Sequence, residues 1–345
     1  MPNALFRCDG GARIGIGHVT RCGALAAALE ERGWRCWFAT TRETAPLLSA
    51  RRAIIVPAGS RGAKAVARVV SAKQIDCLVV DHYGLDAAFE RAARATARMV
   101  VVIDDLGDRP HDCDVIVDPG PLRRVGHRAG RSAGGARLLS GLRHALLRQE
   151  IADLRRGHGR RRAESRGHLL VTMGGADPAG LSGSILAALP ADSETGLRTV
   201  LVVGPANRQR GKLVGAAAAR GLEVVVDPPD LPRRMAAASL VITAGGTTCW
   251  ELACLGVPAI VAVAAENQRR GARAMRRAGA GIVFEDTSER AVRGIAAAVR
   301  RLARDHPRRR RMASAGRRLV DGRGAARVAQ AVTRMLTARR EGERS

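Results

Sequence analysis

Aromatic residues and lysines are scarce in this chain of 345 residues. Phe, Tyr and Trp make up 2% of the sequence, with Tyr83 as the single tyrosine. Only Lys64, Lys73 and Lys212 are lysines, so arginine in an Ala- and Gly-rich chain supplies nearly all of the formal net charge of +26. A basic groove that binds nucleic acid usually also offers aromatic stacking platforms. The composition therefore argues against specific nucleic-acid binding, although a polyanion-binding protein stays an alternative.

We expect no membrane span, no secretory leader and no cysteine framework in this protein. No run approaches the roughly 20 uncharged apolar residues that cross a bilayer, and the first residues show no basic segment followed by an apolar one. The seven cysteines are scattered, and Cys249 and Cys254 are not spaced as zinc ligands. We therefore expect a cytoplasmic protein with reduced thiols and make no prediction of its oligomeric state.

Apolar, β-branched runs alternate with helical patterns along the whole chain, which is typical of parallel sheets covered on both faces. The pattern starts again in the second half, so we expect two similar α/β units in tandem. The predicted domains are residues 1–140, residues 141–330, and a tail of residues 331–345. The predicted strands are Leu5–Cys8, Cys36–Ala39, Ile54–Val56, Cys77–Val80, Met99–Ile103, Val115–Val117, His168–Thr172, Thr199–Val203, Glu223–Val226, Leu240–Thr243, Ala259–Val263 and Gly281–Phe284.

Three segments depart from this alternation. Residues 119–140 are rich in Gly, Arg and Pro without a sustained period, which predicts an interdomain connection. From Ser288 onward the pattern is helical and arginine-rich, and the last helix is expected to pack on the first domain. The arginine runs at 155–162 and 308–311 are expected on solvated faces.

The first strand leads into a glycine-rich turn, and a helix begins near His18. Such a turn is a general anion site, because free amides and the helix dipole favour negative charge. Thr20 occupies the third glycine position of the dinucleotide fingerprint, and Leu213 follows Lys212 where a Walker motif needs Ser or Thr. His18 itself is either a packed capping residue or a catalytic group.

Polar residues gather after the next strands, and their carboxylates and imidazoles raise the alternative of a metal site. Their spacing matches no metal-binding motif, and carboxylates at strand ends often cap turns. We therefore predict no metal and no cofactor. These residues are Asp81, His82, Tyr83, Asp104, Asp105, His111, Asp112 and Asp114.

Two glycine-rich turns in the second half predict a phosphate site. Gly174 and Gly175 follow one strand, and residues 244–248 form a helix start whose amides suit a diphosphate. Glu251 lies on the first turn of that helix, where it also complements the dipole. Residues 266–268, Glu-Asn-Gln, crowd the next turn.

Six motifs in register resemble the UDP-2,4-diacetamido-2,4,6-trideoxy-β-L-altropyranose hydrolase family of pseudaminic acid biosynthesis. They are RCDGGARIGIGHVTRC, VVDHYGLD, VIDDLGDRPHDCD, LLSGLRHALLRQE, LLVTMGGADPAGL and AGGTTCWELACLGVPAIVAVAAENQ. That family is similar to GT-B glycosyltransferases, especially the peptidoglycan N-acetylglucosaminyltransferase. The resemblance implies two Rossmann-like domains facing each other across a cleft, with UDP held by the second. Asp118-Pro119-Gly120 departs from the Asp-Gln-Asn that the family often has.

The resemblance implies metal-independent hydrolysis of a UDP-sugar at the anomeric carbon, with His18 as the catalytic residue. An imidazole with an ordinary pKa suits a general base that activates water at neutral pH. The alternatives are a GT-B glycosyltransferase, a polyanion-binding protein, and a sugar-nucleotide sensor without turnover. The predicted substrate-binding residues are Gly15, Gly17, Arg21, Tyr83, Gly174, Gly175, Gly245, Gly246, Thr247, Glu251, Asn267 and Gln268.

Overall fold

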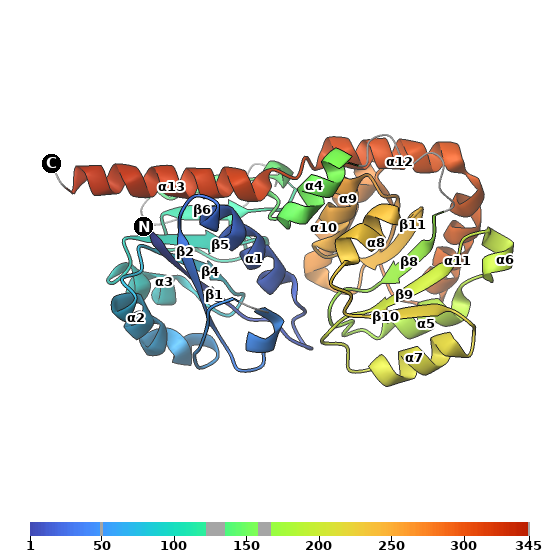
Figure 1. Ribbon diagram of the computed structural model, residues 1–345, viewed down its shortest axis with the longest axis horizontal. Helices are drawn as coiled ribbons and strands as arrows, with labels where there is room; N and C mark the ends of the chain where they lie inside the picture. The colour runs from blue at the N-terminus through green and yellow to red at the C-terminus, as the bar shows by residue number, and fades with distance from the viewer. Residues whose placement is uncertain (49–50, 122–134, 158–166, 344–345) are drawn as a thin grey trace. The chain divides into compact units, whose positions relative to one another are not determined.

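The computed structural model describes residues 1–48, 51–121, 135–157 and 167–343. It contains two compact units, each built on a parallel sheet (Figure 1). The chain crosses to the second unit after Gln149, later than the predicted boundary at residue 140, and returns to the first unit at Arg323. The units are Met1–Gly10, His18–Gln149 and Arg323–Ser345 for the first, and Gly11–Gly17 and Glu150–Gly322 for the second.

The first unit holds a seven-stranded sheet in the order β3-β2-β1-β4-β5-β6-β7. Every pair is parallel, and the order reverses direction between β1 and β4, as in a Rossmann fold. The strands are β1 (Asn3–Cys8), β2 (Arg35–Thr40), β3 (Ala53–Ile55), β4 (Cys77–Asp81), β5 (Met99–Ile103), β6 (Val115–Asp118) and β7 (Arg137–Ser140). The helices are α1 (Gly17–Glu30), α2 (Ala63–Ala72), α3 (Ala87–Arg94) and α13 (Gly324–Gly342).

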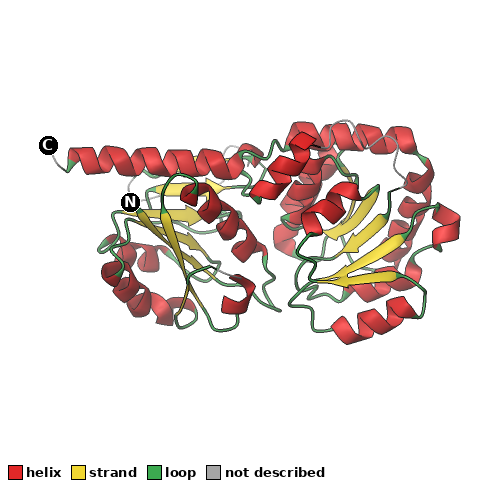
Figure 2. Cartoon of the chain, viewed as in Figure 1, coloured by secondary structure: helices red, strands yellow, loops and turns green. Residues whose placement is uncertain are grey.

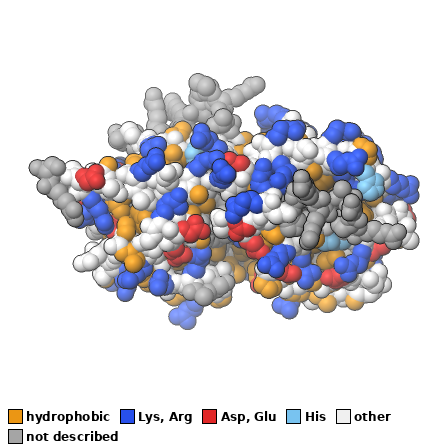
Figure 3. Space-filling view, turned by 45° about the horizontal axis from the view of Figure 1, so that its top comes forward, with side chains coloured by type: hydrophobic (Ala, Val, Ile, Leu, Met, Phe, Trp, Pro, Cys, Tyr) orange, Lys and Arg blue, Asp and Glu red, His pale blue; other side chains and the backbone are white. Residues whose placement is uncertain are grey.

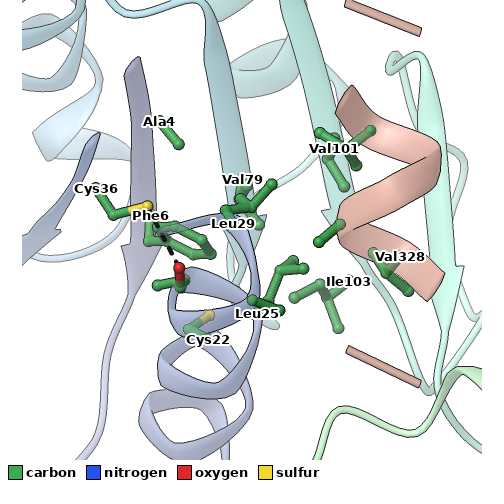
Figure 4. Packing of buried hydrophobic residues seen from close by; sticks show 14 of the residues in the cluster. Ala4, Phe6, Cys22, Leu25, Leu29, Cys36, Val79, Val101, Ile103 and Val328 are labelled. Carbon is green, nitrogen blue, oxygen red and sulfur yellow. Dashed lines mark hydrogen bonds between the residues drawn. The ribbon is translucent and has the colours of Figure 1, made fainter. Parts of the chain in front are cut away.

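Alternate residues of these strands enter two separate cores. Phe6 and Val79 pack with Leu25 and Leu29 of α1 and with Val328 of α13 on one face (Figure 4). The residues between them, such as Leu5 and Leu78, pack against α2 and α3 on the other face. Because both faces are buried, the strands read as continuous apolar runs. The last helix thus packs on the first unit, as predicted.

The second unit repeats this plan with a six-stranded sheet in the order β10-β9-β8-β11-β12-β13. All neighbouring strands are parallel, and the order reverses between β8 and β11. Figure 2 shows helices around the strands of each unit. The strands are β8 (Leu169–Thr172), β9 (Thr199–Val203), β10 (Glu223–Val226), β11 (Leu240–Ala244), β12 (Ala259–Ala262) and β13 (Gly281–Phe284). The helices are α4 (Gln149–Gly157), α5 (Leu181–Ala188), α6 (Asp192–Thr195), α7 (Arg210–Ala218), α8 (Leu231–Ala237), α9 (Thr248–Leu255), α10 (Arg269–Arg277), α11 (Glu289–Arg304) and α12 (His306–Leu319).

All twelve predicted strands are present, but the interpretation of residues 119–140 as a connection is wrong at its end. Arg137–Ser140 forms β7, which pairs with β6 at the edge of the sheet. Leu138 is 50% exposed, so this edge strand lacks the buried apolar run that marks the others. Residues 122–134, in the middle of the segment, lie outside the described residues.

Basic side chains are more numerous than acidic ones on the face of the molecule drawn in Figure 3. The arginine runs at 155–162 and 308–311 were predicted to lie on solvated faces, and two of their arginines do not. Arg309 is buried and donates to the carbonyls of Leu302 and Ala303, and half-buried Arg155 donates to the carbonyl of Cys254. No described helix has the length and hydropathy of a membrane span.

Candidate functional site

The first cluster of polar side chains lies where the strand order of the first unit reverses. His18 is the second residue of α1, which follows β1, and Asp81 is the last residue of the neighbouring strand β4. The chain leaves these two strands toward helices on opposite faces of the sheet. Ligands of open α/β sheets commonly bind at such a switch point, beyond the carboxyl ends of the strands.

His18 is held by a buried carboxylate. Its Nδ1 atom lies 2.6 Å from Oδ1 of Asp81, which is fully buried. Nη2 of Arg21 also lies near Nδ1, but at 3.1 Å it is farther away than the carboxylate oxygen. Because an ionised carboxylate only accepts hydrogen bonds, the shorter contact places the proton on Nδ1, and in the neutral ring Nε2 keeps its lone pair. Nε2 has no hydrogen-bond partner among the described residues. This arrangement fixes the tautomer that a general base requires.

Arg21, one helical turn after His18, pairs with two carboxylates. Its Nε and Nη2 atoms donate to the two oxygens of Asp81, both at 2.6 Å, and Nη1 donates to Asp105 at 2.8 Å. Bidentate pairs of this kind are both strong and directional. Arg21 was predicted to bind substrate, and in the structure its guanidinium aligns Asp81 against the imidazole.

Tyr83 completes the surroundings of the imidazole. Its ring stands edge-on to His18, with ring centroids 4.5 Å apart and planes at 78°. Its hydroxyl donates to Asp105 at 3.1 Å. Tyr83, predicted to bind substrate, thus lies beside His18 in the structure, and Asp105 links its hydroxyl to Arg21.

The positive charges of this cluster lower the pKa values of its two carboxylates, Asp81 and Asp105. Burial by itself raises the pKa of Asp81, but the charges of Arg21 and His18 outweigh burial and hold that pKa well below its usual range. At Asp105, burial likewise raises the pKa, but the charge of Arg21 outweighs burial, so the pKa is lowered there too. Both carboxylates therefore stay ionised at neutral pH, so Asp81 accepts the hydrogen bond from Nδ1–H of His18 throughout that range.

A second buried cluster lies beside the first and involves Asp104 instead of Asp105. His111 contacts Glu90 through Nδ1 at 2.8 Å and Asp104 through Nε2 at 3.0 Å. Burial lowers the pKa of His111, but the two carboxylates outweigh burial and raise it to about 9. His111 is therefore an imidazolium that bridges two carboxylates. Among the described residues, no three Asp, Glu, His or Cys side chains are placed to hold one metal ion.

In the second unit, the glycine turn after β8 does not lead directly into a helix. Gly174 has a positive φ of 83°, and α5 begins only at Leu181. Asp177 accepts the amides of Leu181 and Ser182, so this helix start is already capped. Sequence reasoning did not identify Asp177 as the carboxylate that occupies this helix start.

The helix start after β11 fits the predicted phosphate site better. No described residue accepts a hydrogen bond from the amides of Gly246, Thr247 or Thr248, the first residues around the start of α9. Gln268 joins this turn to the next one, because its Oε1 accepts from the amides of Gly245 and Ala264. Gln268 therefore holds the two turns together. The amides of Gly246, Thr247 and Thr248, called the open amides below, follow Gly245 in the chain.

The remaining predicted residues occupy varied positions. Glu251 is buried on the first turn of α9, and Asn267 is exposed in the turn before α10. Gly15 has a φ of 78° and exchanges two backbone hydrogen bonds with Gly11, so the glycine turn requires it. Gly17 is the first residue of α1.

Gly204 follows β9 at a position where the structure has no room for a side chain, and sequence reasoning did not identify this position. A Cβ at this position would lie 2.5 Å from the carbonyl oxygen of Gly174 and from Cα of Gly175. The amide of Ala206 also donates to the carbonyl of Gly175. The turns after β8 and β9 therefore touch through their backbones, a contact that only the strand order reveals.

Known proteins are similar to this chain in sequence. Residues 168–330 match the Glycosyltransferase family 28 C-terminal domain. The spore coat polysaccharide biosynthesis protein SpsG of Bacillus subtilis is 25% identical over 93% of this chain and 94% of its own length. The UDP-2,4-diacetamido-2,4,6-trideoxy-β-L-altropyranose hydrolase of Campylobacter jejuni is 22% identical over 54% of this chain and 65% of its own. The UDP-N-acetylglucosamine–N-acetylmuramyl-(pentapeptide) pyrophosphoryl-undecaprenol N-acetylglucosamine transferase of Acidothermus cellulolyticus is 33% identical over 62% of this chain and 64% of its own length.

Solved structures share the fold. MurG of Acinetobacter baumannii superposes with a TM-score of 0.64 over 97% of this chain and all of its own, at 15% identity. This likeness confirms the predicted fold of two parallel α/β domains. The chain has the GT-B fold, and its residues 168–330 match the C-terminal domain of glycosyltransferase family 28.

Proposed function

We propose that this chain is an enzyme that breaks the bond between the anomeric carbon and the diphosphate of a UDP-linked sugar, with His18 as the general base. The observation that carries the proposal is the hydrogen bond between His18 Nδ1 and buried Asp81, which leaves Nε2 as the basic atom. A histidine held in this way accepts a proton from a hydroxyl or from water as that oxygen attacks carbon.

Transfer to an acceptor hydroxyl is the reaction that the comparisons support best. The matched domain belongs to a glycosyltransferase family, and the transferase relative is 33% identical. In this reaction the acceptor oxygen bonds to the anomeric carbon, its proton passes to Nε2 of His18, and UDP leaves with the electron pair of the broken bond.

Hydrolysis is the second candidate, favoured by the hydrolase relative and by the six motifs described above. Water then replaces the acceptor hydroxyl, and the proton follows the same route. The preferred substrate would be UDP-2,4-diacetamido-2,4,6-trideoxy-β-L-altropyranose, cleaved without a metal ion. The side chain of His18 does not distinguish the two nucleophiles, because each presents an O–H group.

In both reactions the UDP leaving group needs positive charge rather than a proton. The open amides of Gly246, Thr247 and Thr248, together with the dipole of α9, would supply it. The proposal thus assigns proton transfer to the first unit and diphosphate binding to the second.

The test is incubation of the purified protein with a panel of UDP-sugars in the presence of a chelator, with and without candidate acceptor sugars and lipids. UDP release is measured, and the products are identified by mass. Release that requires an acceptor supports transfer, and release of free sugar in buffer alone supports hydrolysis. Binding of UDP-sugars without any release would contradict both.

A further inference from the structure

A wide groove of about 1030 Å³ lies in the second unit, away from the glycine-rich turns. One wall is formed by Gly279 and by the first residues of β13, starting at Gly281, and the other wall is formed by α12. The groove thus begins at the amino end of β13, whereas the turns that carry the proposed diphosphate site follow the carboxyl ends of the strands. A ligand here would leave the proposed diphosphate site open.

The wall formed by β13 is a free sheet edge. β13 is the last strand of its sheet and pairs only with β12 among the described strands. The carbonyl of Phe284 accepts from Val263 and so faces β12. In a parallel strand successive residues face opposite sides, so Gly281 and Val283 turn their N–H and C=O groups toward the groove. An edge of this kind is a template for another strand.

The wall formed by α12 is strongly basic. No described acidic side chain pairs with any of its four arginines that line the groove. The acidic residue in the lining, Asp305, accepts the amide of Arg308 and caps the helix. Arg276, which also lines the groove, is neutralised by Glu285 at 2.8 Å. The four arginines are Arg308, Arg310, Arg311 and Arg318.

We propose that this groove binds an extended acidic segment of a partner protein, which adds a strand to β13 and directs carboxylates toward α12. Main-chain hydrogen bonds give affinity in this mode, and the side chains give specificity. Guanidinium groups match carboxylates in geometry as well as charge. A nucleic acid would satisfy the arginines but not the strand edge, and none of the described residues that line the groove is an aromatic one that could stack on its bases.

The test uses the full chain and a fluorescent peptide of alternating Glu and Val, with binding followed by anisotropy. The proposal predicts that the peptide binds and that the double variant Arg310→Glu/Arg311→Glu weakens binding about tenfold or more. The matched control Arg290→Glu/Arg301→Glu reverses two exposed arginines of α11 outside the groove and should bind within about twofold of the parent.

The strand edge is tested separately. Val283→Pro removes an outward N–H group at an edge position that tolerates proline, so the protein should fold and lose most of its peptide affinity. A peptide of the same charge in which proline replaces Val should bind poorly. Equal binding of both peptides, or no effect of Val283→Pro, would overturn the proposal. So would a single-stranded oligonucleotide or anionic vesicles that bind this groove more tightly than the peptide does.

Discussion

Asp81 binds Nδ1 of His18 with one carboxylate oxygen and shares both oxygens with Arg21. In an Asp81→Asn variant the amide carbonyl would turn to Arg21, because a guanidinium only donates. The amide NH2 would then face Nδ1, and the proton of the neutral imidazole would move to Nε2. The proposed base would thus hold its proton on the wrong nitrogen.

We therefore expect Asp81→Asn to lower kcat by about 10²- to 10⁴-fold while UDP affinity stays near that of the parent. Cys22→Ser is the matched control, because Cys22 also donates to Asp81 but does not affect the tautomer. UDP affinity is measured by calorimetry and turnover by UDP release. An Asp81→Asn enzyme with parental kcat would rule out this positioning role.

His111 predicts a pH-dependent stability in the first unit. The pKa of its imidazole is raised from 6.5 to about 9 in the folded protein. The ion pairs of charged His111 with Asp104 and Glu90 therefore stabilise the folded state fully below pH 6.5, and this stabilisation is lost as the pH rises through 9. A pKa difference of this size corresponds to at most about 3 kcal/mol in the free energy of unfolding.

Chemical unfolding of the parent and of His111→Gln between pH 6 and about 9.5 measures this effect. The parent should lose stability across the range, while the variant should be less stable at pH 6 and show a flatter profile. The cysteine thiols are buried in the folded state and titrate in the unfolded chain of both proteins, so the difference between the two curves isolates His111. Parallel curves would show that His111 is neutral in the folded state.

Gly204 predicts a steric effect on the second unit. Gly204→Ala would press a methyl group against the backbone of Gly174 and Gly175, which cannot move aside as a side chain can. We expect it to lower the free energy of unfolding by about 1–3 kcal/mol or more. Gly211→Ala, in α7 with open space around the new methyl, should instead stabilise by up to about 1 kcal/mol. Urea unfolding compares the two, and equal stabilities would contradict the close contact.

A substitution at Gly246 is expected to weaken UDP binding without lowering the stability of the fold. No atom lies within 4 Å of a Cβ built at this residue, so Gly246→Ala should fold with parental stability. The methyl group would stand at the start of α9, where we propose the diphosphate to approach. UDP affinity, measured by calorimetry, should fall about tenfold or more, whereas Gly215→Ala in α7 should not change it. Unchanged affinity in Gly246→Ala would place the diphosphate elsewhere.

The sequence predicts most strands and helices, but it predicts few of the hydrogen bonds between side chains that are distant in the chain. Strands such as Met99–Ile103 are predictable because burial on both faces makes the whole run apolar. The edge strand β7 lacks that burial, so only its pairing with β6 identifies it. The glycine turn marked His18, since a histidine at such a junction is unusual.

The partner of His18 was beyond sequence reasoning. Asp81 is 63 residues away and was one of several carboxylates at strand ends. Only the pairing of β1 with β4, rather than with β5, brings it to His18 while Asp104 meets His111 instead. Asp177 was likewise invisible, because its capping role depends on where α5 begins.

The proposed role of His18 as the general base is tested most directly by the turnover of His18→Asn, measured by UDP release alongside its affinity for UDP. We expect a kcat lower by about 10²- to 10⁴-fold, with UDP affinity unchanged because the proposed diphosphate site lies in the second unit. Turnover close to that of the parent would show that His18 is not the base.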